Sequence, residues 1–350
     1  MTGPTTSPAT GPRIARIDAV DPAAESDLRA WHEVMVAGEV HGREEWAAPR
    51  DFAEVREALR HASPGVAHEA WLAWSDGVPC AAAHLEYRLL DNLDRADSLV
   101  VVHPAHRRRG VGSSLLEAMV ERARELGRSR LGGEAWWPLE LPDGRGSEGA
   151  DFLTRRGFEL GVVEVVRVLD LPADPDLLAR AEAEVAAASS GYRIESFAGA
   201  VPQEWAAGWA RLTGSLDVEA PTGSIAVEAW DDGVAGLRAD EELRERQGRS
   251  TIGAVALDPA GEVVAYTELV RTRHQPTRAF QYGTLVAPAH RGHRLGLAVK
   301  TAALRHLERI DDAARRIWTF NAEVNTPMIE VNERLGYRPV ERAGWFERRI

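Results

Sequence analysis

A nine-residue segment that occurs twice constrains this chain more than any other feature. Pro104–Gly112 reads PAHRRRGVG and Pro288–Gly296 reads PAHRGHRLG, an offset of 184 positions (288 minus 104). An apolar run typical of a buried strand precedes each copy, LVVV in the first and TLVA in the second. Apolar residues at helical spacing follow each copy. Two long units with the same order of elements indicate a duplication rather than a solenoid.

The remainder of each half repeats the same order of elements, which predicts an α/β fold with two similar lobes. Each half has an opening strand and then two strands around a tight turn, ahead of the repeated segment. Each half closes with a strand, a short helix and a glycine–aromatic pair, Gly157–Phe158 or Gly336–Tyr337. These pairs are 179 positions apart (336 minus 157), so one small gap separates the two copies.

The chain has 350 residues, enough for two domains of about 100–200 residues each. Pro172 and Pro175 interrupt the pattern between the halves, and the following stretch reads either as a bridging helix or as a flexible tether. We therefore expect a disordered tail over 1–12, an N-terminal lobe over 13–172, a linker helix over 173–190 and a C-terminal lobe over 191–350.

Composition excludes several classes of protein. The net charge of −12 argues against a nucleic-acid partner, although it permits a cationic small molecule. No apolar stretch approaches the roughly 20 residues that cross a membrane, and the first residues lack the apolar core of a secretory signal. Cys80 is the one cysteine, so no internal disulfide is possible, and the histidines lack helical metal-binding spacing. We expect a cytoplasmic protein without a metal.

The first copy of the repeat has the chemistry of a phosphate-binding turn. Successive backbone N–H groups in such a turn point at one spot, and the following helix N-terminus adds about half a positive charge. Gly110 and Gly112 lack a Cβ, so a phosphate can approach the backbone closely. Arg107, Arg108 and Arg109 add full positive charges. The turn suits a pyrophosphate, and the alternative is an ordinary solvated run of arginines.

The pattern Arg107-x-x-Gly110-x-Gly112 after an apolar strand resembles the coenzyme A-binding motif of the GNAT N-acetyltransferases. The resemblance covers both halves, so the chain is similar to tandem GNAT proteins, including actinobacterial proteins like mycothiol synthase. It implies that each lobe has a mixed, twisted sheet splayed between its fourth and fifth strands. Acetyl-CoA would lie in that gap, with its pyrophosphate on the turn and its pantetheine arm along the fourth strand.

The same resemblance implies a set of cofactor-binding residues in each lobe. In the first lobe they are Val100, Val101, Val102, Arg107, Arg108, Arg109, Gly110, Val111, Gly112 and Ser113; in the second they are Leu285, Val286, Arg291, Gly292, His293, Arg294, Leu295, Gly296, Asn321 and Asn325.

The second copy departs from the motif at its first glycine. It keeps Arg291 and Gly296 but has Arg294 at the position of Gly110, with Gly292 two positions earlier. A shifted alignment that begins at His293 also fits the motif. Either Arg294 adopts an ordinary helical conformation and donates to phosphate, or its side chain fills the phosphate site.

Asn325 lies eleven residues before its Gly–aromatic pair, where the family usually has an asparagine that contacts pantetheine. Asn321 lies four residues earlier, and on a helix the two would share one face. The alternative for these residues is helix capping before Pro327. The first lobe has Gly146 at the corresponding position.

Transfer of an acetyl group to an amine requires a base for the ammonium and an acid for the leaving thiolate. In several family members the base lies ten residues before the motif arginine, which is Asp97 here and Gln281 in the second lobe. Glu86, on the preceding strand, is a second candidate for the base. The usual tyrosine acid is replaced by Leu153 and Asn332.

We therefore expect an acyltransferase that moves acetyl from acetyl-CoA to a primary amine of a small molecule or peptide, with catalysis in the N-terminal lobe. The alternatives are catalysis in the C-terminal lobe, as in mycothiol synthase-like enzymes, or an acyl-CoA sensor without turnover. Trp136 or Trp137 is a candidate to line the acceptor pocket. We expect no nucleic acid or membrane partner, and a monomer or homodimer.

Overall fold

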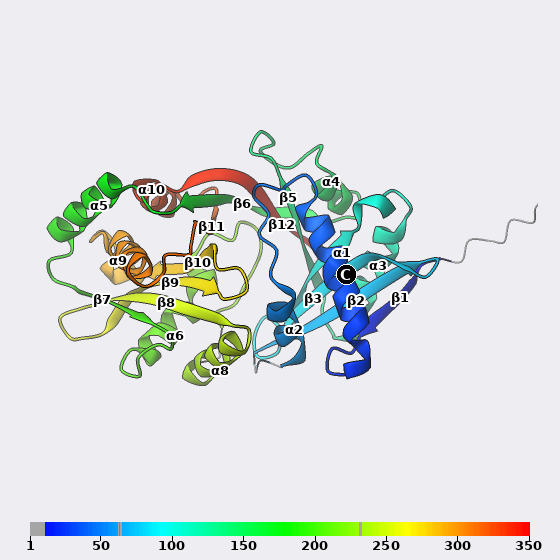
Figure 1. Cartoon of the computed structure of the whole chain (residues 1–350), viewed down its shortest axis with the longest axis horizontal. Helices are drawn as coiled ribbons and strands as arrows, with labels where there is room; N and C mark the ends of the chain where they lie inside the picture. Colours follow the sequence, from blue (N-terminus) through cyan, green and yellow to red (C-terminus); the bar gives the residue numbers. More distant parts are fainter. Residues whose placement is uncertain (1–10, 62, 64, 231–232) are drawn as a thin grey trace, which may run out of the picture.

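A computed structural model describes residues 11–61, 63, 65–230 and 233–350 of the chain. It confirms the α/β class: a mixed, twisted sheet runs through two lobes that have helices on both faces (Figure 1). The expected disordered tail over 1–12 falls mostly outside the described residues. Among the described residues, no helix is both long and apolar enough to cross a lipid bilayer.

The two halves contribute the same succession of elements, as the repeat predicts. The strands are β1 (Arg13–Ile17), β2 (Val66–Ser75), β3 (Val78–Arg88), β4 (Arg95–Val102), β5 (Arg130–Trp137), β6 (Glu159–Asp170), β7 (Arg193–Ala198), β8 (Arg249–Leu257), β9 (Val263–Thr272), β10 (Arg278–Val286), β11 (Arg316–Ala322) and β12 (Arg338–Arg349). The α-helices are α1 (Glu25–Val40), α2 (Phe52–Arg60), α3 (Val111–Glu125), α4 (Glu148–Thr154), α5 (Pro175–Ala188), α6 (Ala206–Gly214), α7 (Leu216–Glu219), α8 (Gly233–Arg246), α9 (Leu295–Ile310) and α10 (Thr326–Arg334).

Helix α3 covers one face of the first lobe because its apolar residues recur at helical spacing. Leu115, Leu116 and Met119 are completely buried against strands β3 to β5. Helix α9 has the same role in the second lobe, where Leu304 and Leu307 pack into the corresponding core. The helix that follows each repeated segment therefore fixes that segment to the sheet.

Each lobe has the predicted splay between its fourth and fifth strands. In the first lobe, β4 and β5 pair in parallel only where residues 95–98 face residues 130–133. In the second, β10 and β11 pair only where residues 278–281 face residues 316–319. Beyond these short ladders the strands diverge, and the ends of β4 and β10 each lead into one copy of the repeated turn. The divergence creates the gap in which a ligand can contact strand backbone.

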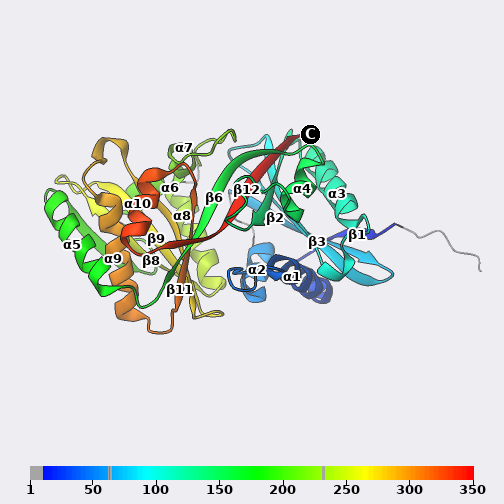
Figure 2. The same cartoon turned by 90° about the horizontal axis from the view of Figure 1, so that it is seen from above.

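The final strand of each half lies in the sheet of the other half. The strand order is β1-β2-β3-β4-β5-β12-β6-β11-β10-β9-β8-β7, so β12 pairs with β5 and β6 pairs with β11. Figure 2 shows β6 and β12 side by side as they pass from one lobe to the other. The expected lobes 13–172 and 191–350 divide the sequence, but they do not divide the sheet, because each lobe contains the last strand of the other half. The domain boundaries therefore remain a prediction.

The linker is a helix rather than a flexible tether. The Asp174 side chain accepts hydrogen bonds from the backbone N–H groups of Asp176 and Leu177, which caps the N-terminus of α5. Leu178 and Ala181 are buried in the same core as α9. The linker helix therefore packs as part of the second lobe.

The strand exchange predicts that the first half does not fold alone as a stable monomer. Residues 1–172 lack β12, and so lose both the partner of β5 and the buried Phe346 ring, leaving an unpaired sheet edge. We expect this fragment to aggregate or self-associate in size-exclusion chromatography, and co-production with residues 173–350 to restore a 1:1 complex. A stable, folded monomer of the fragment would show that β6 can replace β12 beside β5.

Candidate functional site

The two copies of the repeated turn have the same backbone path and exchange the position of one glycine. Each turn needs two residues with positive φ. In the first copy these are Arg108 (φ 64°) and Gly110 (φ 84°); in the second they are Gly292 (φ 87°) and Arg294 (φ 56°). Each copy thus places glycine at one left-handed position and arginine at the other. The alignment that pairs Gly110 with Arg294 is therefore structurally correct, and the alignment shifted to His293 is wrong.

The structure overturns the backbone part of the expectation for Arg294, and donation by its side chain to phosphate remains a prediction. The residue is left-handed rather than helical, and it precedes α9 as its N-cap. Its Nε lies 2.7 Å from Glu184 Oε1 on α5 and the side chain is 43% exposed, so this ion pair directs the guanidinium toward the linker helix through one of its three nitrogen atoms. The sequence could not show this, because the partner comes from the linker helix.

The left-handed backbone of Arg294 predicts that glycine is more stable than alanine at this position. Arg294→Gly and Arg294→Ala both remove the ion pair, but only alanine keeps the left-handed strain of about 1–2 kcal/mol. The glycine variant should therefore be about 1 kcal/mol more stable than the alanine variant in urea denaturation. At Arg305, inside α9, the order should reverse, because alanine is favoured over glycine in a helix by about 1 kcal/mol. The same order at both positions would contradict the assigned strain.

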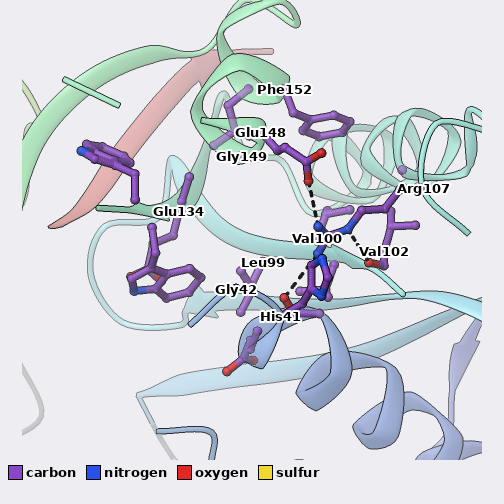
Figure 3. Close-up of a pocket in the computed structure, with 18 of the residues that line it drawn as sticks. His41, Gly42, Leu99, Val100, Val102, Arg107, Glu134, Glu148, Gly149 and Phe152 are labelled. Atoms are coloured by element: carbon purple, nitrogen blue, oxygen red, sulfur yellow. Dashed lines mark hydrogen bonds and ion pairs between the residues drawn. The ribbon is translucent and has the colours of Figure 1, made fainter. Parts of the chain in front are cut away.

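The gap of the first lobe holds a cavity of about 950 Å³, here called the first-lobe cleft. Most of the residues predicted for the first lobe line it: Val100, Val101, Val102, Arg107, Arg108, Gly110, Val111, Gly112 and Ser113. Arg109 is exposed and does not line the cleft. Leu99, Val100 and Val102 lie on the β4 side, with Glu134 on the β5 side (Figure 3). The side chains of Phe152 and Arg156, which the motif did not predict, also line the cleft.

The arginine at the head of each motif holds the strand end and the turn together. Arg107 Nε donates to the Val102 carbonyl at 3.3 Å, and its Nη1 pairs with Glu148 at 2.8 Å (Figure 3). Arg291 makes equivalent contacts in the second lobe, to the Val286 carbonyl at 3.3 Å and to Glu219 at 2.8 Å. Both arginines thus fix the backbone of the turn.

Glycine at position 112 lets the start of α3 pack closely against β4 at the wall of the first-lobe cleft. A Cβ at Gly112 would lie 2.9 Å from Val102 Cγ2, so glycine alone fits without a shift. Gly112 is in the first turn of α3, where backbone N–H groups have no partner within the helix. Arg156, whose guanidinium lies 3.7 Å from the Phe152 ring centroid, adds positive charge. These features fit the phosphates of a coenzyme A.

In the second lobe the two predicted asparagines have structural partners. Asn325 is the N-cap of α10 and accepts a hydrogen bond from the Met328 N–H at 3.4 Å, which is the capping alternative. Asn321 accepts from Asn332, whose Oδ1 in turn lies 2.5 Å from Lys300 Nζ. Burial lowers the pKa of Lys300 to about 7, and nearby Arg167 contributes. Contact of Asn321 and Asn325 with pantetheine remains a prediction.

A second cavity of about 750 Å³ lies between the lobes and is here called the central chamber. The N-terminal half supplies strands β2 to β6 and helices α1 and α2, and the C-terminal half supplies α7 and strands β8, β10, β11 and β12. The chamber and the first-lobe cleft share the lining residues Glu39, Arg43, Trp46, Ser98, Leu99, Glu134, Trp136 and Glu341. The two cavities therefore meet at the point where β4 and β5 diverge.

Asp97 and Glu86, the predicted bases, both line the central chamber rather than the first-lobe cleft. Arg95 Nη2 lies 2.6 Å from Asp97 Oδ1, and Arg95 Nε donates to the same oxygen. Burial raises the pKa of Asp97, while the Arg95 charge acts in the opposite direction. Arg95 thus holds one oxygen of Asp97 while the net shift of the Asp97 pKa is upward, so a role for Asp97 as the base remains a prediction.

Glu134 is a candidate site residue that the sequence motifs missed. It lies on β5 and lines both cavities at their junction. Burial raises the pKa of Glu134 well above its usual value, and the nearby carboxylates of Glu164 and Glu39 add to the effect. Burial also raises the pKa of Glu39 and of Glu164. The available signal was a single carboxyl group in the otherwise uncharged strand segment LGGEAWW.

Comparison with known proteins agrees with this geometry. The profile of the Acetyltransferase (GNAT) family matches residues 31–134 and 215–337, one match in each half. A comparison with curated proteins finds no match. The chain therefore belongs to the GNAT acetyltransferase family and has two tandem GNAT lobes.

Solved structures with the same two-lobed fold include a tandem GNAT protein from the clavulanic acid biosynthesis pathway. It is 26% identical, with a TM-score of 0.75, and the match covers 97% of this chain and 98% of that one. A GCN5-related N-acetyltransferase from Sphaerobacter thermophilus is 14% identical, with a TM-score of 0.61 over 96% of this chain and 95% of that one. The latter likeness concerns the fold alone.

Proposed function

We propose that the protein transfers an acetyl group from acetyl-CoA, bound in the first-lobe cleft, to a primary amine in the central chamber. The observation that carries the proposal is the position of Glu134, a buried carboxyl group that lines both cavities where they meet. A tandem GNAT neighbour is described in a form without acetyl-CoA, which agrees with this choice of donor.

Successive parts of the cleft would bind successive parts of acetyl-CoA. The N–H groups at the start of α3 and the guanidinium groups of Arg108 and Arg156 would hold the pyrophosphate. The backbone of Val100 to Val102, free of β5 pairing, would hold the pantetheine arm. Acetyl-CoA supplies the thioester carbonyl that the amine attacks. The lining of the cleft includes no tyrosine among the described residues, so the leaving thiolate would take its proton from water or from a lining side chain such as His41 or His106.

Glu134 would accept the proton of the incoming ammonium. A raised pKa makes a carboxylate a stronger base, closer to the pKa of the group that it must deprotonate. The central chamber also offers carboxyl groups to an ammonium: Glu39, Glu134, Glu164 and Asp217 line it beside Arg50 and Arg249, and none of the four has an arginine ion pair within 4 Å among the described residues. Asp97, held by Arg95, would help to orient the amine.

Catalysis by the first lobe predicts that matched glycine substitutions have unequal effects. Gly112→Glu places a carboxylate beside the phosphates and should weaken acetyl-CoA binding at least about tenfold, or 1.4 kcal/mol. Gly296→Glu adds a carboxylate at the corresponding position of the second lobe, where a Cβ has more room (3.8 Å from Val286 Cγ2, against 2.9 Å from Val102 Cγ2 at Gly112), and should leave that binding intact. Calorimetry on the full chain measures both, with thermal melts as the control for folding. Loss of binding only in Gly296→Glu would place the donor in the second lobe.

Glu134 as the base predicts a large loss of turnover and a changed pH profile. Glu134→Gln should lower kcat about 10²–10⁴-fold, with little change in KM for acetyl-CoA. Since the carboxylate form is the active one, wild-type kcat should fall as the pH drops through a pKa above 4.5. The glutamine variant should lack this limb of the profile. An Asp97→Asn variant that loses more activity than Glu134→Gln would instead favour Asp97.

A further inference from the structure

Three potential metal ligands come together on neighbouring strands at the wall of the central chamber. His68 lies on β2 directly opposite Glu86 on β3, and His84 lies opposite Ala70, two residues along the same face. Side chains two residues apart on a strand point to the same face of the sheet. All three side chains line the central chamber. The register of one hairpin thus assembles two imidazoles and a carboxylate.

The distances within this cluster suit one metal ion. One ligand atom from each of His68, His84 and Glu86 can be chosen so that all three lie within 4.8 Å of one another. His68 Nδ1 is 3.4 Å from Glu86 Oε2, close to the roughly 3.3 Å between two ligands of a tetrahedral zinc. The imidazole centroids are 5.2 Å apart, close to the roughly 5 Å set by a zinc–nitrogen distance of about 2 Å, but the rings are stacked with 16° between their planes, so at least one ring must rotate to bind a shared ion.

One nitrogen atom of the cluster has no hydrogen-bond partner among the described residues. His68 Nδ1 is buried and has no hydrogen-bond partner among the described residues, because its contact with Glu86 does not complete a hydrogen bond. Buried nitrogen atoms rarely remain unpartnered unless a water or ion completes them. The ring of Trp31 packs edge-on against His84 and holds it in place. Arg50 is the main opposing charge, and Glu54 and Glu86 partly neutralise it.

We propose that His68, His84 and Glu86 bind a divalent transition metal of the zinc class at the wall of the central chamber. Two imidazoles and one carboxylate are a ligand set that zinc enzymes use with a fourth position open. The ligands line the chamber, so the open position faces the space assigned to the acceptor. A metal there would bind a donor atom of the acceptor and orient it. The metal site stands on its own geometry and does not depend on the proposed acetyl transfer.

The test is titration of the untagged, chelator-treated full chain with Zn²⁺ in a calorimeter, together with Co²⁺ absorption spectroscopy. We expect one site of micromolar or tighter affinity and visible Co²⁺ bands of a four- or five-coordinate ion. His84→Ala and His68→Ala should each weaken Zn²⁺ binding at least tenfold. Glu86→Gln, a change at a half-exposed carboxylate, should weaken it with no change in the melting temperature of the metal-free protein.

The matched control is the other close histidine pair, His103 and His106, whose ring centroids are 5.7 Å apart. The double variant His103→Ala/His106→Ala should bind Zn²⁺ as the wild type does. Absence of Zn²⁺ binding by the wild type would overturn the proposal, as would binding that persists in a folded Glu86→Gln/His84→Ala variant. Loss of binding only in the control variant would place the metal on the repeated turn instead.

Discussion

The pairing of β12 with β5 and of β6 with β11 is the constraint on which the rest of the structure depends. It joins two duplicated halves into one sheet and fixes the face of one lobe against the face of the other. The central chamber exists because of this pairing, since its walls come from both halves. The two lobes are therefore not independent units on a tether. Val340 and Glu341 on the final strand line the first-lobe cleft, so removing this strand would alter a cavity in the other half of the chain.

Within that framework, strand divergence and a strained turn create the proposed donor site. Short parallel ladders end four residues into each fifth strand, which frees the backbone of β4 to bind a ligand. The turn that follows requires two left-handed residues, and the duplicated copies meet this requirement with glycine and arginine in opposite order. A left-handed arginine costs about 1–2 kcal/mol. Because each copy contains one, at different positions of the turn, the surrounding contacts must stabilise this backbone conformation. The contacts of Arg107 and Arg291 with strand carbonyls are part of that support.

The sequence predicted the fold class, the two lobes and the turn between strand and helix, because each depends on a local pattern: apolar runs, helical spacing and glycine positions. It did not predict the strand exchange, because the residues of β6 and β12 specify a strand without specifying its neighbour. The sequence did not identify Glu134 as a candidate site residue, because only the folded chain shows that it lies where two cavities meet. The cluster of His68, His84 and Glu86 shows the same limit: their spacing on the chain suggests no site, and only the register of β2 and β3 brings them together.

The central claim is that acetyl-CoA lies in the first-lobe cleft with its thioester facing Glu134 and the central chamber. A crystal structure of the full chain with acetyl-CoA tests it most directly. The account predicts a pyrophosphate at the start of α3, a pantetheine arm along Val100 to Val102, and a thioester carbon within reach of an amine held by Glu134. A coenzyme found between β10 and β11 alone, with the first-lobe cleft empty, would contradict it.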